Sequence, residues 1–416
     1  MDASTLPVAA ATPPFPRAVL PCYRGRGISS IPASILEFFG GRLEGHPPLD
    51  ADLLPPGFLD GVKTVVFMLV DGLGYSLLER AVRSQPRLEL GRLMREGLYG
   101  RLTSVLPSTT TTALATLATG LTPQEHGLIG YKLFLREVNE IANMIRFSPV
   151  ARLAPFPRKK LNPQAFFDHA TIFQALLDLG VTSRVVIRSQ YAHSALSKMF
   201  YRGAEVVGHA GTHDAFAVLR RMLEQRDGSG SFIYFYWDPI DTVSHHNGPN
   251  SEEVMAEIMG LDYAIRTHVL ERFRGGDVAL FITADHGHVH TPPARRMAFN
   301  NVPDLLNLLQ RPPSGDSRLP YVLSKEGRRE EVLGMINERF PEVLRATPYE
   351  EVISANWFGI GEPHPELPHR VGDLVVSVAD DWKISYRYST EEIESIGCHG
   401  GTDPEEMYVP FIGVRI

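Results

Sequence analysis

Three apolar runs, each followed closely by an acidic residue, constrain the fold of this chain more than any other feature of its sequence. The runs are TVVFMLV at Thr64–Val70, FIYFYW at Phe232–Trp237 and VALFIT at Val278–Thr283. Continuous runs of β-branched and apolar residues are typical of strands that are buried on both faces. Helix-like segments separate them, and strands that alternate with helices predict a parallel sheet covered by helices on both faces.

The spacing of these patterns predicts an α/β fold with a smaller insertion. We expect a mostly parallel central sheet sandwiched by helices, built from residues 59–291 and 398–416. The regular alternation stops there, so residues 292–397 are interpreted as a smaller α+β insertion, or cap. Residues 1–58, rich in Pro, Ala and Gly, are expected to form an N-terminal arm packed on the core. The last apolar run, Tyr408–Val414, is expected to return to the central sheet.

Composition and charge exclude several classes of protein. A net charge of −7 argues against a stable nucleic-acid-binding surface. The two cysteines, Cys22 and Cys398, provide no disulfide framework and fit a reducing compartment. No apolar run approaches the roughly 18 residues of a membrane-spanning helix, and the N-terminal residues lack the basic start of a signal peptide. We therefore expect a soluble, cytoplasmic protein that does not bind membranes.

Six aspartate and histidine residues lie near the ends of predicted strands. They are Asp71, Asp241, His245, Asp285 and His286, together with His399 in the loop before the last strand. Any one of them has an ordinary explanation, because Asp-Gly is a common turn and a lone histidine is more often a packed core residue. The carboxyl ends of parallel strands meet at one edge of a sheet, however, so these side chains are expected to converge. Three aspartates and three histidines supply the donors that zinc accepts, and they divide into two triads.

A run of four threonines, Thr109–Thr112, adds a cluster of hydroxyl groups. Pro107 and Ser108 precede it, and the helix-compatible segment after it stops at Gly120, which are start and stop signals of a helix. The unpaired N–H groups and the positive dipole end at a helix N-terminus favour an anion. Taken alone, the run is interpreted as helix capping. Beside metal ligands, one of its hydroxyl groups would complete one of the triads.

Five short motifs resemble those of the alkaline phosphatase superfamily, and most closely its nucleotide pyrophosphatase/phosphodiesterase (type I phosphodiesterase) branch. The motifs are VDG at Val70–Gly72, PSTT and LATGLTPQEHGLIG within Pro107–Gly130, PIDTVSHHNGP at Pro239–Pro249, TADHG at Thr283–Gly287 and HGG at His399–Gly401. Together they occur in the family's order. The resemblance implies an alkaline-phosphatase-like fold and a metal-dependent hydrolase of phosphodiester or pyrophosphate bonds.

The resemblance also implies a role for each candidate residue. The first metal site would consist of Asp71, Thr110, Asp285 and His286, and the second of Asp241, His245 and His399. Thr110 takes the position of the family's nucleophile, ten residues before the glycine of the ATG element, with Thr109 and Thr111 as rivals. The implied reaction passes through a covalent phospho-threonine. Two divalent ions are expected, with zinc as the first choice and manganese or iron as alternatives.

The substrate is where this chain departs from the family pattern. The diesterase branch usually has an asparagine that bonds a phosphate oxygen, and this chain has Tyr131, whose hydroxyl can also donate. Tyr131, Lys132 and His290 are the candidate substrate-binding residues. The extra histidine His288, beside the ligands in sequence, is interpreted as a supporting or surface residue without a catalytic role.

Three functions follow from this reading. A phosphodiesterase or nucleotide pyrophosphatase is the main hypothesis, and a phosphomonoesterase or phosphonate hydrolase on the same scaffold is the alternative. A catalytically silent binding module is disfavoured because no ligand is lost. The expected partner is a small-molecule phosphoester, with nucleotides among the candidates. The sequence names neither the natural substrate nor the oligomeric state.

Overall fold

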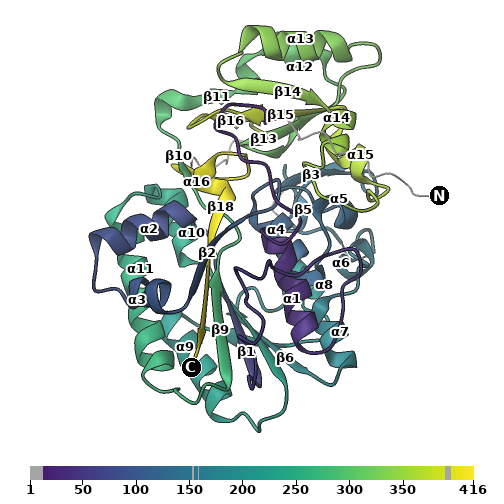
Figure 1. Cartoon of the computed structure of the whole chain (residues 1–416). Coiled ribbons are helices and arrows are strands. Elements are labelled where there is room, and N and C mark those ends of the chain that lie inside the picture. Colours follow the sequence, from purple (N-terminus) through teal and green to yellow (C-terminus); the bar gives the residue numbers. More distant parts are fainter. Residues whose placement is uncertain (1–12, 152–153, 158, 389–394) are drawn as a thin grey trace, which may run out of the picture.

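Two seven-stranded sheets organise the chain, one above the other in Figure 1. The computed structural model describes residues 13–151, 154–157, 159–388 and 395–416. The first twelve residues of the expected arm and residues 389–394 of the expected insertion lie outside this description. Among the described residues, no helix is both long and apolar enough to cross a membrane.

The lower sheet in Figure 1 is the predicted central sheet. Its strand order is β2-β18-β9-β1-β8-β6-β7. The strands are β1 (Thr64–Val70), β2 (Leu98–Thr103), β6 (Thr182–Arg188), β7 (Glu205–His209), β8 (Ser231–Trp237), β9 (Val278–Thr283) and β18 (Tyr408–Arg415). All pairs among β9, β1, β8, β6 and β7 are parallel, and β18 runs antiparallel to both of its neighbours. The predicted mostly parallel sheet and the return of the last strand are therefore confirmed.

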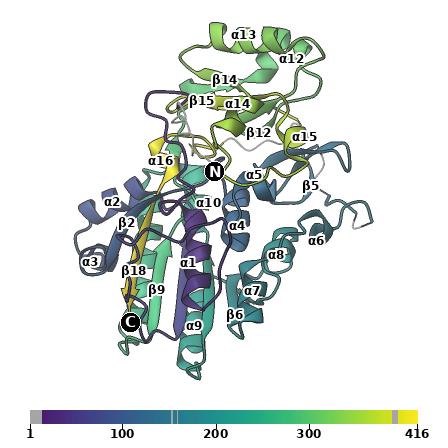
Figure 2. The ribbon, with the colours of Figure 1, turned by 45° about the vertical axis from the view of Figure 1, so that its right-hand side comes forward.

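Helices cover both faces of the central sheet, as the apolar strands require. Every residue of β1 and β9 is buried, which leaves no strand face for water. One face carries α1 (Ile31–Phe38), α4 (Thr110–Thr119), α7 (Ile172–Asp178) and α8 (Ala195–Phe200), which contact one another. The other carries α2 (Tyr75–Ser84), α3 (Glu89–Glu96), α9 (Thr212–Glu224), α10 (Pro239–Asn247) and α11 (Glu252–Ile265), as Figures 1 and 2 show. A π-helical turn, Arg266–Leu270, directly follows α11.

The upper sheet is antiparallel and draws on two separate parts of the sequence. Its order is β14-β15-β13-β12-β3-β4-β5. The strands are β3 (Lys132–Leu135), β4 (Glu140–Asn143), β5 (Ser148–Pro149), β12 (Ser314–Asp316), β13 (Leu319–Val322), β14 (Leu344–Pro348) and β15 (Leu374–Val378). Strands β3–β5 come from a segment that the sequence pattern placed with the core. They join the insertion through the pairing of Lys132 with Gly315.

Short helices complete the upper layer and its connections. They are α5 (Pro123–His126), α6 (Pro163–Phe166), α12 (Pro303–Leu308), α13 (Arg329–Arg339), α14 (Tyr349–Ser354), α15 (Leu367–Val371) and α16 (Pro404–Met407). Two small ladders also form, β10 (Val289–His290) with β17 (Gly397–Cys398) and β11 (Arg296–Ala298) with β16 (Lys383–Ser385). A small apolar cluster between α12, α13 and strands β14 and β15 is separate from the main core.

Candidate functional site

The register of the central sheet brings the ends of three strands to the same level. Val70 pairs with Trp237, and Leu69 pairs with Thr283. Asp71, the next residue after β1, extends the ladder by donating its backbone N–H to the Trp237 carbonyl at 2.9 Å. Side chains that follow β1, β8 and β9 therefore lie together at the carboxyl edge of the sheet, where open α/β sheets bind ligands.

The first group of side chains centres on Nε2 of His286. This atom lies 3.5 Å from Oδ1 of Asp71, 3.3 Å from Oδ2 of Asp285 and 3.1 Å from Oγ1 of Thr110. The other carboxylate oxygen of Asp285 is held by two hydrogen bonds, which it accepts from the backbone N–H groups of Gly72 and His286. The other carboxylate oxygen of Asp71 is held by a hydrogen bond that it accepts from the hydroxyl of Tyr236. The four residues that the sequence analysis assigns to the first metal site therefore lie together in the structure, and their role as ligands stays a prediction.

Only one hydroxyl of the threonine run faces this group. Thr109 is the N-cap of α4, in extended conformation, and Thr110 begins the helix. The hydroxyl of Thr111 points away and donates to the Gly130 carbonyl at 3.0 Å, and the Thr112 hydroxyl is buried without a partner among the described residues. Successive helical residues point in different directions, so the geometry selects Thr110 from its rivals.

The second group consists of Asp241, His245 and His399. Asp241 and His245 are one turn apart on α10, so both side chains lie on the same face of that helix. Nε2 of His245 lies 3.4 Å from Oδ1 of Asp241 and 3.2 Å from Nε2 of His399. The β10–β17 ladder brings His399 here, because Val289 pairs with Cys398. The loop is held further by Ser108, whose hydroxyl donates to the Gly401 carbonyl at 2.8 Å.

The three histidines have the same hydrogen-bonding pattern. Nδ1 of His245, His286 and His399 lies 2.8 Å, 3.1 Å and 3.1 Å from the backbone carbonyl oxygens of Gly397, Gly287 and Ser108, respectively. A carbonyl only accepts, so each Nδ1 carries a hydrogen, and Nε2 is the ring nitrogen that is directed at the site. Histidines that bind metals are usually oriented in this way.

These donor sets fit divalent metal ions. Tetrahedral ligands at zinc distances are separated by about 3.3 Å, close to the separations in both groups. Asp71 Oδ1 and Asp285 Oδ2 are buried and have no hydrogen-bond partner among the described residues, yet both point at Nε2 of His286. Burial, together with the nearby Asp285 and Asp241, raises the pKa of Asp71 well above its ordinary value. A cation would remove the cost of placing these carboxylates side by side.

In the second group, the His399 ring is poorly suited to carry a proton. Burial, followed by the neighbouring His286, His245 and His288, lowers the pKa of His399 well below its ordinary value. The rings of His286 and His399 stack with their centroids 3.7 Å apart, so the two groups adjoin. The two adjacent groups offer carboxylate oxygens, imidazole nitrogens and one hydroxyl group, which are the kinds of donor that hold two metal ions for displacement at phosphorus.

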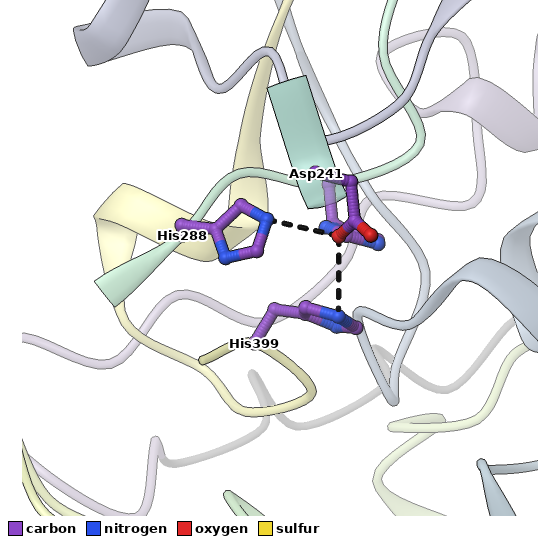
Figure 3. A group of neighbouring side chains, drawn as sticks. Asp241, His288 and His399 are labelled. Atoms are coloured by element: carbon purple, nitrogen blue, oxygen red, sulfur yellow. Dashed lines mark hydrogen bonds and ion pairs between the residues drawn. The ribbon is translucent and has the colours of Figure 1, made fainter. Parts of the chain in front are cut away.

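His288 is the residue that the sequence interpretation undervalued. It is fully buried, and its Nε2 lies 3.0 Å from Oδ1 of Asp241, as Figure 3 shows. Burial lowers the pKa of His288 to about 4, so the ring is neutral and its Nε2–H donates to Asp241. Its ring also lies edge-on to those of His245 and His399. The only sequence signal was its position two residues after His286 in the DHGHVH segment.

The predicted substrate-binding residues lie outside both groups. Tyr131 is half-buried beside the threonine run, and its hydroxyl accepts from the Asn143 amide at 2.7 Å. Lys132 begins β3 with its Nζ 4.8 Å from the centroid of the Tyr388 ring. His290 is exposed on β10 and packs against Gly248 at the end of α10. Contact of these residues with a substrate stays a prediction.

Comparisons with known proteins agree with the geometry. The sequence model of the type I phosphodiesterase / nucleotide pyrophosphatase family matches residues 65–402. Murine ectonucleotide pyrophosphatase/phosphodiesterase 5 is 18% identical, with a TM-score of 0.63 over 83% of this chain and 87% of that one. Phosphonoacetate hydrolase from Sinorhizobium meliloti is 19% identical, with a TM-score of 0.64 over 84% of this chain and 89% of that one. At these identities the two structures support the fold alone. No curated protein sequence matches the chain significantly.

Proposed function

Because the chain belongs to the type I phosphodiesterase / nucleotide pyrophosphatase family, a class of binuclear metal-dependent hydrolases, we propose that it cleaves phosphodiester or pyrophosphate bonds with Thr110 as the nucleophile. The observation that carries this proposal is the position of the Thr110 hydroxyl. It lies 3.1 Å from Nε2 of His286, where two carboxylate oxygens that have no hydrogen-bond partner in the described part of the chain also converge.

The donor groups suggest how the metals would be held. We assign one site to Asp71, Thr110, Asp285 and His286, and the other to Asp241, His245 and His399. Zinc suits these nitrogen and oxygen donors at tetrahedral spacing, and manganese or iron are the alternatives. When bound, two such ions would lower the pKa of the hydroxyl group and neutralise charge on the phosphate oxygens.

The residues of the chain would then perform the displacement in two steps. Thr110 Oγ1 attacks phosphorus, an Oγ1–P bond forms, and the bond from phosphorus to the leaving oxygen breaks. The first N–H groups of α4 have no acceptor within the helix and point toward the charge that develops at phosphorus. The oxygen of a water molecule then bonds to phosphorus, the Oγ1–P bond breaks, and Oγ1 regains a proton, which restores the threonine. A solved form of the murine neighbour, described as inactive, has one threonine replaced by alanine and holds AMP, which supports both the residue type and the substrate class.

A matched pair of valine substitutions tests the nucleophile. Thr110 and Thr112 are both buried in the first turn of α4, and valine keeps the shape of threonine while removing the hydroxyl. Thr110→Val is expected to reduce turnover of bis-p-nitrophenyl phosphate to the background rate. Thr112→Val removes a hydroxyl without a partner and is expected to keep full activity. Turnover by folded Thr110→Val at the wild-type rate would remove Thr110 from the proposal.

A phosphomonoesterase or phosphonate hydrolase is the second candidate. Tyr131 replaces the asparagine of the diesterase pattern, and one of the similar structures is described as a phosphonate hydrolase. A substrate panel on metal-loaded enzyme separates the possibilities. It should contain bis-p-nitrophenyl phosphate, p-nitrophenyl phosphate, phosphonoacetate and nucleotide pyrophosphates. A strong preference for the monoester or the phosphonate would favour the second candidate.

A further inference from the structure

One hairpin of the upper sheet reaches down to the loops that carry the candidate active site. Strands β12 and β13 form this hairpin, with Asp316 paired to Leu319 around a two-residue turn. Three of its side chains, Asp316, Arg318 and Tyr321, are buried and contact loops of the central domain rather than solvent. The sequence offered no sign of this, because the segment RPPSGDSRLP has the composition of a turn or loop.

Asp316 contacts two segments, the N-cap of the threonine helix α4 and the chain just before β3. Its Oδ2 accepts the backbone N–H of Tyr131 at 3.1 Å, and its carboxylate lies beside the hydroxyl of Thr109, the N-cap of α4. One carboxylate therefore connects the residue before Thr110 to the predicted substrate-binding residue Tyr131. Tyr321, on the second strand of the hairpin, adds a hydrogen bond from its hydroxyl to the Ile129 carbonyl at 2.8 Å.

Arg318 supports the other ligand-bearing loop through Glu406. Both side chains are completely buried, and the guanidinium donates to the carboxylate at 2.9 Å and 3.2 Å. The same carboxylate accepts the backbone N–H groups of Gly401 and Asp403, each at 3.0 Å. Gly401 lies two residues after His399 and Asp403 lies four residues after it, so Glu406 fixes the loop that presents the His399 ring.

Two glycines show how closely the hairpin fits. A Cβ atom on Gly130 would lie 3.0 Å from Oδ2 of Asp316, and one on Gly400 would lie 2.7 Å from the Cβ of Asp316. Both glycines also have positive φ values, of 150° and 113°, which other residues rarely adopt. Asp316 is thus wedged between the segment that leads to Tyr131 and the segment that begins at His399.

We propose that Asp316 and Arg318 are positioning residues, through which the upper sheet holds Thr110 and His399 in register with each other. The proposal rests on the assignment of Thr110 and His399 in the proposed function. A purely structural role is a poorer explanation, because a buried ion pair is usually no better for stability than apolar residues of similar size. The upper sheet would therefore set the geometry of the catalytic centre as well as cover it.

A double substitution tests Arg318 without leaving a charge buried alone. Arg318→Met with Glu406→Leu removes both charges together and keeps the volume similar. We expect a folded protein that binds two zinc equivalents, one of them 10- to 100-fold more weakly than in the wild type, because the His399 loop has lost its support. The matched control is Arg329→Met with Glu350→Leu, an ion pair of the same insertion whose side chains are 33% and 67% exposed.

The readout is zinc retention against a graded chelator, which does not depend on turnover. Wild-type affinity for both equivalents in the folded double variant would overturn the role of Arg318. If the wild type binds zinc but hydrolyses none of the substrates, the proposed function fails. The zinc measurement still tests the role of Arg318 in that case.

Asp316→Asn tests the other contact. Asparagine keeps the shape of the side chain but replaces one of the two accepting oxygens with an NH2 group, which can only donate. We expect kcat to fall about 10- to 100-fold with little change in KM, in zinc stoichiometry or in the thermal midpoint at pH 7, because the nucleophile is displaced rather than removed. Asp304→Asn, at an exposed position in the same insertion, is the control. An unchanged kcat in Asp316→Asn would overturn the role of Asp316.

Discussion

Nε2 of His245 lies 3.2 Å from Nε2 of His399, and both rings turn Nδ1 toward a backbone carbonyl. These carbonyls, of Gly397 and Ser108, respectively, accept the Nδ1–H of each ring. Burial and the neighbouring histidines lower the pKa of His399 well below its ordinary value, so a metal ion suits the space between the two Nε2 atoms better than a proton. The two backbone carbonyls thus hold this pair of rings in an orientation that suits a metal ion.

Removal of metal is therefore expected to destabilise the protein as well as inactivate it. A ligand that binds the folded state alone adds stability of about 4 kcal/mol when its concentration is a thousand times its dissociation constant. The thermal midpoint with excess zinc should exceed the midpoint after chelation by several degrees, and zinc should restore activity. Magnesium is the control, because it prefers oxygen ligands in octahedral geometry. Identical melting curves with and without zinc would contradict the assignment.

Loss of the His288 donor is expected to weaken the second site. His288→Phe keeps a ring in the buried position but removes the hydrogen bond to Oδ1 of Asp241. Substitution of a residue that orients a metal ligand typically costs 10- to 100-fold in metal affinity. Competition with a chromogenic chelator measures this change, and His246→Phe, at an exposed position on the same helix as Asp241, is the control. Equal zinc affinity in the two variants would show that Asp241 does not need the donor.

The stability of the protein should depend on pH through Asp316. Burial raises the pKa of Asp316 to about 7, although the Tyr131 N–H, the Thr109 hydroxyl, Lys132 and His286 all lower it. In the unfolded chain the pKa of an aspartate is about 3.9, so between these values the folded protein holds a proton that the unfolded chain has released. Stability from this group therefore falls as the pH rises from about 4 to about 7 and then levels off.

Comparison with Asp316→Asn isolates this contribution. Thermal midpoints of both proteins, measured from pH 5 to pH 8 with saturating zinc, should differ by an amount that changes steadily from pH 5 up to the pKa of Asp316, about 7, and stays constant above it. The wild type should lose more stability than the variant over this range. Parallel curves would mean that Asp316 is already ionised at the lower end.

The hydroxyl groups of Thr111 and Thr112 are expected to differ in their contribution to the stability of the protein. Thr111 donates to the Gly130 carbonyl, and Thr111→Val would leave that buried acceptor unpaired at a cost of about 1–3 kcal/mol. Thr112→Val removes no hydrogen bond and should be close to neutral. Urea unfolding of the two variants measures the difference. Equal stability would mean that the Gly130 carbonyl finds another donor.

The central sheet could be predicted because its strands carry their own signal. The bounds of β1 and β9 match the apolar runs in the sequence residue for residue, since strands buried on both faces need continuous apolar residues. Five of the six Asp and His candidates follow such strands or lie on the helix after one, so the topology of the sheet gathers them. His399 depended on the family motif, and the two-residue β10–β17 ladder that positions it has no signal in the sequence.

The upper sheet could not be predicted in the same way. Its strands β3, β4 and β5 have four residues or fewer and mix polar with apolar side chains, so their pattern does not differ from that of a loop. Their partners lie far away in the sequence, and Lys132 pairs with Gly315. Asp316 and Arg318 belong to no motif. Their importance appears only when the hairpin is seen between Thr109 and Glu406.

The place of β18 in the central sheet has a consequence for the order in which the chain folds. β18 lies between β2 and β9, so β2 joins the sheet through a strand that is synthesised after residues 104–407. Until then, the edge of β9 is open, and apolar residues that the finished sheet buries are accessible to other chains. The upper sheet, whose strands end at Val378, is complete before that edge is closed. A chain stalled before Tyr408 would thus display a finished upper layer above an open sheet and would depend on chaperones until its last strand arrived.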